Sequence, residues 1–199
     1  MVNVSRLNSI LLMLIIVINA YIVITPFTPQ MWFWWQSHHS SRAAQLSQAI
    51  QHPKKSAANK PAPSPSNAVI VPAMLLDQPI FEGSNKNAYS VLNKGIWRWP
   101  SSSTPDKGGN TVLIGHRFTY TTPRGVFYFL DKLRVGDSIG VTWDNQHYIY
   151  RVVNIAVVPP TQTSILDQTT EPTLTLYTCT PLWWPKDRLV VTAHLESKL

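Results

Sequence analysis

The chain has 199 residues, with 17 Lys and Arg against 10 Asp and Glu, 16 Pro, 8 Gly and a single Cys. One cysteine excludes an internal disulfide framework and any zinc or iron–sulfur site built from several cysteines. Residues 1–68 hold five of the basic residues and no acidic one, so residues 69–199 carry a net charge of only +2. A nucleic-acid-binding domain concentrates positive charge on its folded part, and we therefore expect no nucleic-acid partner.

The first 35 residues predict a membrane anchor. Residues 7–24 contain no charge, and about 20 apolar residues span the hydrocarbon core of a bilayer. An aromatic run follows at residues 31–35, which suits the headgroup level. A cleaved signal peptide is the alternative, but its small-x-small cleavage pattern is poor because bulky Ile18 stands two residues before Ala20. The flanking basic residues are too few to give the orientation of the anchor.

Residues 36–68 are rich in Ser, Ala, Gln and Pro and contain few large apolar residues. Such a segment cannot bury enough apolar surface to offset the entropy lost on ordering, so the composition predicts a flexible linker. Within it, residues 42–50 have the pattern of a transient helix.

Residues 69–199 predict an all-β domain. The expected strands alternate or are rich in β-branched and aromatic residues, and turn-forming residues separate them. About seven or eight closely spaced strands in 131 residues indicate a sandwich or a barrel. No dinucleotide-binding or P-loop pattern is present, and we expect no cofactor and no metal site. The strands that the pattern marks are 111–114, 138–143, 146–153, 155–158, 173–178 and 188–194, with one short helix at 126–133.

Three polar residues stand at the ends of apolar strands: His116, Cys179 and Arg188. If residues 173–179 pair antiparallel with residues 188–194, Cys179 and Arg188 face each other with Cβ atoms about 5 Å apart. That pairing places a guanidinium beside a thiol. Taken singly, such residues are most often a small buried cysteine, a hydrogen-bonded structural histidine and a solvated arginine. The spacing alone therefore does not establish an active site.

Several short motifs, in order, resemble the sortases, the membrane-anchored transpeptidases of bacterial surfaces. Residues 175–179 are Thr-Leu-Tyr-Thr-Cys and fit the TLxTC signature of that family. Residues 115–117 (Gly-His-Arg), 129–133 (Phe-Leu-Asp-Lys-Leu) and 136–137 (Gly-Asp) are similar to its histidine motif and the segment that follows. The nine-residue step from Cys179 to Arg188 resembles the pilin-type class. A lid motif and a second hydrophobic segment are not found, which leaves the class open.

The resemblance implies a single-pass protein of the cell membrane whose catalytic domain is a closed β-barrel outside the cytoplasm. This domain is expected to cleave a C-terminal sorting signal of LPxTG type. Cys179 is then the nucleophile, because a thiolate attacks carbonyls and a free cysteine, with a pKa of about 8.5, needs a cationic neighbour to form one at neutral pH. His116 is the general acid and base, and Arg188 holds substrate carbonyls or the oxyanion. The implied partners are surface proteins that carry the signal and an amine acceptor, either a cell-wall precursor or a pilin lysine.

Three further residues are candidates for substrate binding. Thr178 precedes the nucleophile, and its hydroxyl either contributes a hydrogen bond to the site or is simply buried. Trp183 and Trp184 line a peptide groove, touch the membrane or cap the end of the barrel. Two other functions stay open: a chymotrypsin-like cysteine protease, and a membrane-tethered β-barrel that binds cell-wall polymer without catalysis.

Overall fold

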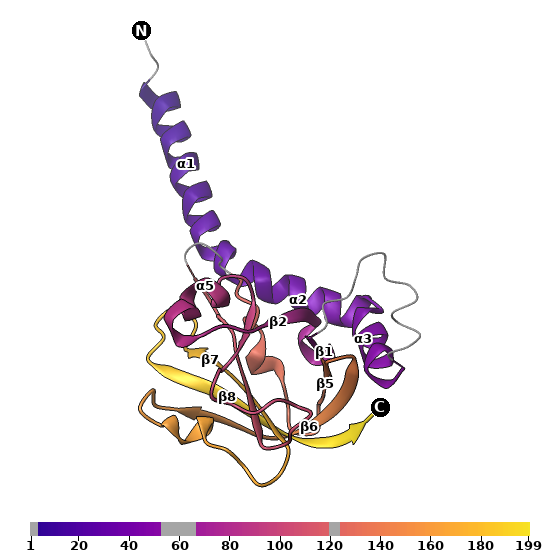
Figure 1. The fold of residues 1–199 in the computed structure, drawn as a ribbon. Helices are drawn as coiled ribbons and strands as arrows, with labels where there is room; N and C mark the ends of the chain where they lie inside the picture. Colours follow the sequence, from indigo (N-terminus) through magenta and orange to yellow (C-terminus); the bar gives the residue numbers. More distant parts are fainter. Residues whose placement is uncertain (1–3, 53–66, 120–123) are drawn as a thin grey trace. The chain divides into compact units, whose positions relative to one another are not determined.

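The computed structural model describes residues 4–52, 67–119 and 124–199 (Figure 1). The chain divides into two compact units, Met1–Arg42 and Ala43–Leu199. The first unit contains α1 (Val4–Ile24), the 3-10 turn η1 (Thr25–Phe27) and α2 (Thr28–His39). Among the described residues, one helical segment is long and apolar enough to cross a membrane, Ser5–His39, and an 18-residue window within it has a mean hydropathy of 2.6.

Helix α3 (Arg42–Gln51) lies where the sequence predicts a flexible linker. Its Leu46 and Ile50 are buried, with 8% and 5% of their surface exposed. Ile50 packs over Gly140 of the barrel so closely that a Cβ at Gly140 would stand 2.7 Å from Ile50 Cγ1. The structure thus has a docked helix at Arg42–Gln51, where the sequence predicts a transient helix at residues 42–50 within a linker. Residues 53–66 of that linker lie outside the described part of the chain.

Eight strands form a closed barrel in the order β1-β2-β3-β4-β7-β8-β6-β5, as the sequence predicts for an all-β domain of seven or eight strands. The β2–β3 and β4–β7 pairs are parallel, and the other neighbours are antiparallel. The strands are β1 (Ala68–Val71), β2 (Leu76–Phe81), β3 (Ile96–Arg98), β4 (Asn110–Ile114), β5 (Ser138–Trp143), β6 (Gln146–Val158), β7 (Thr173–Thr180) and β8 (Asp187–Lys198).

Two details of the barrel differ from the sequence prediction. The strands expected at 146–153 and 155–158 are a single strand, β6, with a register shift between Val152 and Asn154. The helix expected at 126–133 is a series of turns that ends in the 3-10 turn η4 (Leu130–Lys132). Phe127, Leu130 and Leu133 are buried there, and hydrogen bonds join each of them to the next. Buried residues at intervals of three resemble the apolar face of a helix in the sequence, but the backbone here forms consecutive turns.

The short helix of the barrel is α5 (Ala88–Leu92), which precedes β3. It packs outside the barrel against β3, β4 and β7, in a cluster formed by the buried residues Val91, Trp97, Val112 and Ile114. Tyr177 of β7 belongs to this outer cluster. Because side chains alternate along a strand, Cys179, two residues later, lies on the same outer face, and the deeply buried Leu176 and Thr178 point to the barrel interior.

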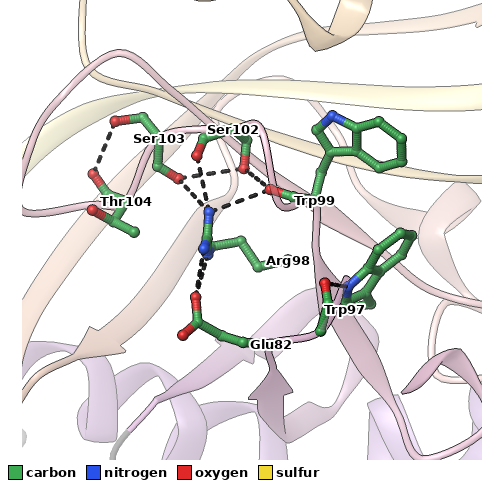
Figure 2. A network of polar contacts seen from close by, with 8 residues as sticks. Glu82, Trp97, Arg98, Trp99, Ser102, Ser103 and Thr104 are labelled. Atoms are coloured by element: carbon green, nitrogen blue, oxygen red, sulfur yellow. Dashed lines mark hydrogen bonds and ion pairs between the residues drawn. The ribbon is translucent and has the colours of Figure 1, made fainter. Parts of the chain in front are cut away.

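Arg98 of β3 joins the residue that follows β2 to the turn that follows β3 (Figure 2). Its Nε donates to Glu82 Oε1 at 2.8 Å, and its Nη1 donates to the carbonyl of Ser102 at 2.9 Å and to that of Trp99 at 3.3 Å. The neighbouring Trp97 donates from Nε1 to the carbonyl of Gly83 at 3.0 Å. These bonds fix the end of β2 and the turn after β3, because a planar guanidinium holds several acceptors in one fixed geometry.

Candidate active site

Cys179 and Arg188 are direct register partners in the antiparallel pair of β7 and β8. This confirms the pairing predicted from the two strands and the loop between them. Directly opposed residues project their side chains to the same face, about 5 Å apart at Cβ. The loop is closed at its base, since the N–H of Lys186 donates to the carbonyl of Thr180 at 3.1 Å. The thiol and the guanidinium are therefore placed by strands and not by a loose loop.

His116 reaches the same level through the parallel pair of β4 and β7. The last register partners of this pair are Ile114 and Tyr177. Beyond them, the N–H of Gly115 donates to the carbonyl of Tyr177 at 3.3 Å, and the hydroxyl of Thr178 donates to the carbonyl of Gly115 at 2.7 Å. His116 and Cys179 each stand two residues after the last pair, so the strand register brings them to the same end of the barrel.

His116 is half-buried, and this burial lowers the pKa of its imidazole from the ordinary value. The ring of Tyr89 packs edge-on against it, with ring centroids 6.2 Å apart. Nε2 of His116 is buried and has no hydrogen-bond partner among the described residues. Burial thus favours the neutral imidazole, in which one nitrogen can accept a proton and return it to an amine.

Arg188 supplies the positive charge of the site. Within the described part of the chain, its guanidinium makes one hydrogen bond, from Nη1 to the carbonyl of Asp187 at 3.1 Å. Burial raises the pKa of the neighbouring Tyr177 hydroxyl, while Arg188 acts to lower it and Cys179 to raise it. Arg188 therefore has donors to offer to a carbonyl or an oxyanion beside the thiol.

The three residues predicted to bind substrate lie in different surroundings. Thr178 is only 1% exposed, and its hydroxyl already donates to Gly115, so its side chain connects β7 to the histidine strand. Trp183 packs edge-on against Phe118 at a centroid distance of 4.8 Å. Trp184 is 80% exposed and projects into solvent. The two tryptophans thus stand on the loop that leads from Cys179 to Arg188.

The contacts of the Arg117 side chain are not predicted from the sequence. Arg117 follows His116 directly, and its side chain is 11% exposed. Its Nη1 donates to the hydroxyl of Thr180 at 2.7 Å, and its Nη2 forms an ion pair with Asp131 at 3.0 Å. The sequence signal for these contacts is the arginine of the Gly-His-Arg motif at residues 115–117. Within residues 4–52, 67–119 and 124–199, no group of three or more His, Cys, Asp or Glu side chains is placed to hold a metal ion.

Comparison with known proteins identifies the family. The family model described as "Sortase domain" matches residues 69–196. Sortase SrtE1 of Streptomyces coelicolor is 31% identical over 136 residues, which cover 61% of this chain and 37% of that protein. Sortase D of Bacillus subtilis is 30% identical over 130 residues, which cover 64% of this chain and 61% of that protein.

A solved structure agrees with these matches. The crystal structure of sortase E1 from Streptomyces coelicolor with a tripeptide in the active site superposes with a TM-score of 0.58 at 27% identity, covering 69% of this chain and 91% of that one. The matched segment spans less than two thirds of the full length of either curated relative. The two relatives carry different class letters at almost the same identity, so the matches do not select a class. The barrel, its histidine and cysteine strands and the family match together show that the chain belongs to the sortase family.

Proposed function

We propose that this chain is a membrane-anchored cysteine transpeptidase that cleaves a C-terminal sorting signal of LPxTG type and transfers the acyl group to an amine. The observation that carries the proposal is the register pairing of Cys179 with Arg188, at the strand level where His116 also lies. A nucleophile, a proton carrier and a fixed cation on one face are the groups that acyl transfer requires. The tripeptide in the active site of the Streptomyces coelicolor sortase E1 structure supports a peptide as substrate.

In the first half of the reaction, His116 accepts the thiol proton of Cys179 as the sulfur attacks the carbonyl carbon of the scissile peptide bond. The carbonyl oxygen becomes an oxyanion, which the donors of Arg188 stabilise. When the tetrahedral intermediate collapses, the C–N bond breaks and His116 gives its proton to the departing amine. The product is a thioacyl-enzyme on Cys179.

The second half runs the same steps in reverse with a different amine. The incoming amine attacks the thioester carbon and gives its proton to His116, whose neutral form is favoured by burial. The C–S bond then breaks, and the cysteine sulfur recovers its proton from His116. A new amide bond has formed, no oxidant or reductant is consumed, and the enzyme returns to its starting state.

The N-terminal segment supports a location at the membrane. Ser5–His39 is helical and long enough to span a bilayer, and the side chains of its most apolar 18-residue window are exposed. We therefore assign a single-pass anchor with the barrel outside the cytoplasm, where surface proteins with a sorting signal pass. The acceptor amine is a cell-wall precursor or a pilin lysine.

The test is an assay of the full-length protein in detergent with a library of LPxTG-like peptides and an added amine, analysed by mass spectrometry. The expected result is a peptide–amine product and a thioacyl adduct on Cys179 in the wild type, with neither in the Cys179→Ala variant. Transfer by the Cys179→Ala variant contradicts the assignment of the nucleophile. Cleavage with no amine product indicates a cysteine protease, and peptide binding without any cleavage indicates a binding module.

A further inference from the structure

The backbone ladder between β4 and β7 ends before it reaches the reactive residues. Its last register pair is Ile114 and Tyr177, whereas His116 and Cys179 lie two residues farther along. A histidine beyond the end of a ladder needs other contacts to hold it, because a displacement of about 1 Å at a reacting group costs about 100-fold in rate. Bonds other than those of the ladder must therefore hold the two chain segments together past Ile114.

Side-chain bonds extend the ladder on both sides of the reactive pair. Before Cys179, the hydroxyl of Thr178 donates to the carbonyl of Gly115 at 2.7 Å. After Cys179, the hydroxyl of Thr180 accepts from Nη1 of Arg117 at 2.7 Å. The residue before His116 is thus bonded to the residue before Cys179, and the residue after His116 is bonded to the residue after Cys179.

The Arg117 side chain is suited to this task because each of its three guanidinium nitrogens has an acceptor within the protein. Besides Thr180, its Nε donates to the carbonyl of Tyr128 at 3.4 Å, and its Nη2 pairs with Asp131 at 3.0 Å. Only 11% of the side chain is exposed. The rigid guanidinium therefore joins the histidine strand, the cysteine strand and the η4 turn in one geometry.

Backbone bonds anchor the histidine to the same turn. The carbonyl of His116 accepts from the N–H of Phe127 at 3.0 Å, and the carbonyl of Arg117 accepts from the N–H of Gly125 at 3.1 Å. The ring of Phe127 lies against Gly115, where an added Cβ would stand 2.7 Å from Phe127 Cδ2. The turn that contains Phe127 thus holds the backbone of His116, and Arg117 connects this turn to β7, the strand of Cys179.

We infer that Arg117 and Thr180 are positioning residues that set the separation of His116 and Cys179 through a hydrogen bond between the residues that follow them. This inference rests on the proposed function for its catalytic readout. It gives the two arginines near the thiol different tasks: Arg117 uses its donors within the protein, and Arg188 keeps donors for the substrate. Thr180 acts through its hydroxyl, which accepts from Nη1 of Arg117.

The test compares Arg117→Lys, Thr180→Val and Thr180→Ser in the full-length protein in detergent. Lysine keeps the charge but cannot reach three acceptors, and valine keeps the shape of threonine without the acceptor. We expect both changes to lower kcat about 10- to 100-fold, with KM within about two-fold of the wild type, because a displaced proton carrier affects the chemical step. Thr180→Ser, which keeps the hydroxyl, restores kcat to within about three-fold of the wild type.

A second readout needs no peptide. The rate at which iodoacetamide alkylates Cys179 is measured against pH in each variant, and the profile is expected to shift in Arg117→Lys and Thr180→Val but not in Thr180→Ser. If the wild type transfers no peptide, the proposed function fails, and the alkylation profiles still test the positioning. Unchanged kcat and unchanged profiles in both Arg117→Lys and Thr180→Val overturn the inference.

Arg98→Lys is the matched control, since Arg98 is also a nearly buried arginine with several acceptors, none of them next to His116 or Cys179. It is expected to lower the melting temperature while the alkylation profile stays that of the wild type. A profile shifted by Arg98→Lys as much as by Arg117→Lys shows a general loss of stability and also overturns the inference.

Discussion

Cys179 and Arg188 face each other across β7 and β8 as direct register partners, at the point where the two strands join the loop between them. The guanidinium is consequently on the same face as the sulfur without any contribution from loop conformation. Its only hydrogen bond among the described residues goes to its own neighbour, Asp187. A permanently charged group with free donors beside a nucleophile is suited to an oxyanion that forms during the reaction.

Replacing Arg188 by lysine tests whether the planar donors or only the charge matter. Lysine keeps the positive charge but presents a single ammonium on a flexible stem, so we expect kcat/KM to fall by about 100-fold or more, as for loss of an oxyanion donor. Steady-state transfer of a sorting peptide to an amine measures the effect, with the melting temperature as a control for folding. Wild-type kcat/KM in Arg188→Lys would show that charge alone suffices.

Two partly buried histidines make the stability depend on pH. Burial lowers the pKa of both His116 and His147, so the unfolded chain binds protons that the folded chain does not. Stability from this source is complete above the ordinary histidine pKa of about 6.5 and is lost as the pH falls from there to the lowered values. We expect the free energy of unfolding to decline as the pH falls below about 6.5.

Urea unfolding followed by circular dichroism at a series of pH values measures that decline. The double variant His116→Gln/His147→Gln is expected to show a shallower slope than the wild type, because neither position then titrates in this range. The Cys179→Ala variant serves as a comparison with both histidines intact. An equally steep slope in the double variant would show that the acid sensitivity has another source.

Gly140 controls the docking of α3. A Cβ at this position would stand 2.7 Å from Ile50 Cγ1 and 3.3 Å from two further atoms of the same side chain. We therefore expect Gly140→Ala to weaken the docking by about 1–3 kcal/mol, as overpacking commonly does. Hydrogen exchange over residues 42–51 is expected to become faster.

The double variant Gly140→Ala/Ile50→Ala provides the control. Shortening Ile50 removes the overlap, so the two changes together are expected to cost less than the sum of the single changes. Full additivity, or a Gly140→Ala variant in which α3 exchanges as slowly as in the wild type, contradicts the close packing.

Trp184 offers a test of substrate contact that is separable from stability. It is 80% exposed, so Trp184→Ala is expected to change the free energy of unfolding by less than about 0.5 kcal/mol. If it binds the peptide, KM rises about tenfold, equivalent to about 1.4 kcal/mol, with kcat unchanged. Val157→Ala removes another exposed apolar side chain, at 60% exposure on β6, and is the matched control. Equal KM values in both variants would exclude Trp184 from the peptide site.

The sequence predicted the cysteine–arginine pair because all the necessary signals are local. β7 ends just after Cys179, β8 begins just before Arg188, and Pro181 and Pro185 disfavour strand pairing between them. The ends of the two strands limit the register of such a hairpin, and the structure sets it with Cys179 opposite Arg188. The position of His116 beside Cys179 depends instead on a parallel pairing of β4 with β7, two strands far apart in the sequence.

The regions that the sequence missed lack a strong local pattern. β1, β2 and β3 are short, and β2 contains Pro79, which weakens a strand prediction. Helix α3 buries only Leu46 and Ile50 among polar neighbours, and what makes that burial possible is a glycine on a strand about ninety residues later. Tertiary contacts of this kind decide the structure where composition alone predicts a flexible segment.

The hydrogen bond from the N–H of Lys186 to the carbonyl of Thr180 lies between the Cys179–Arg188 pair and the exposed loop that connects β7 to β8. It closes the hairpin before residues 182–185 begin, so the strand positions of Cys179 and Arg188 do not depend on the conformation of those residues. Changes of composition in those four residues are therefore expected to leave the register of Cys179 and Arg188 unchanged.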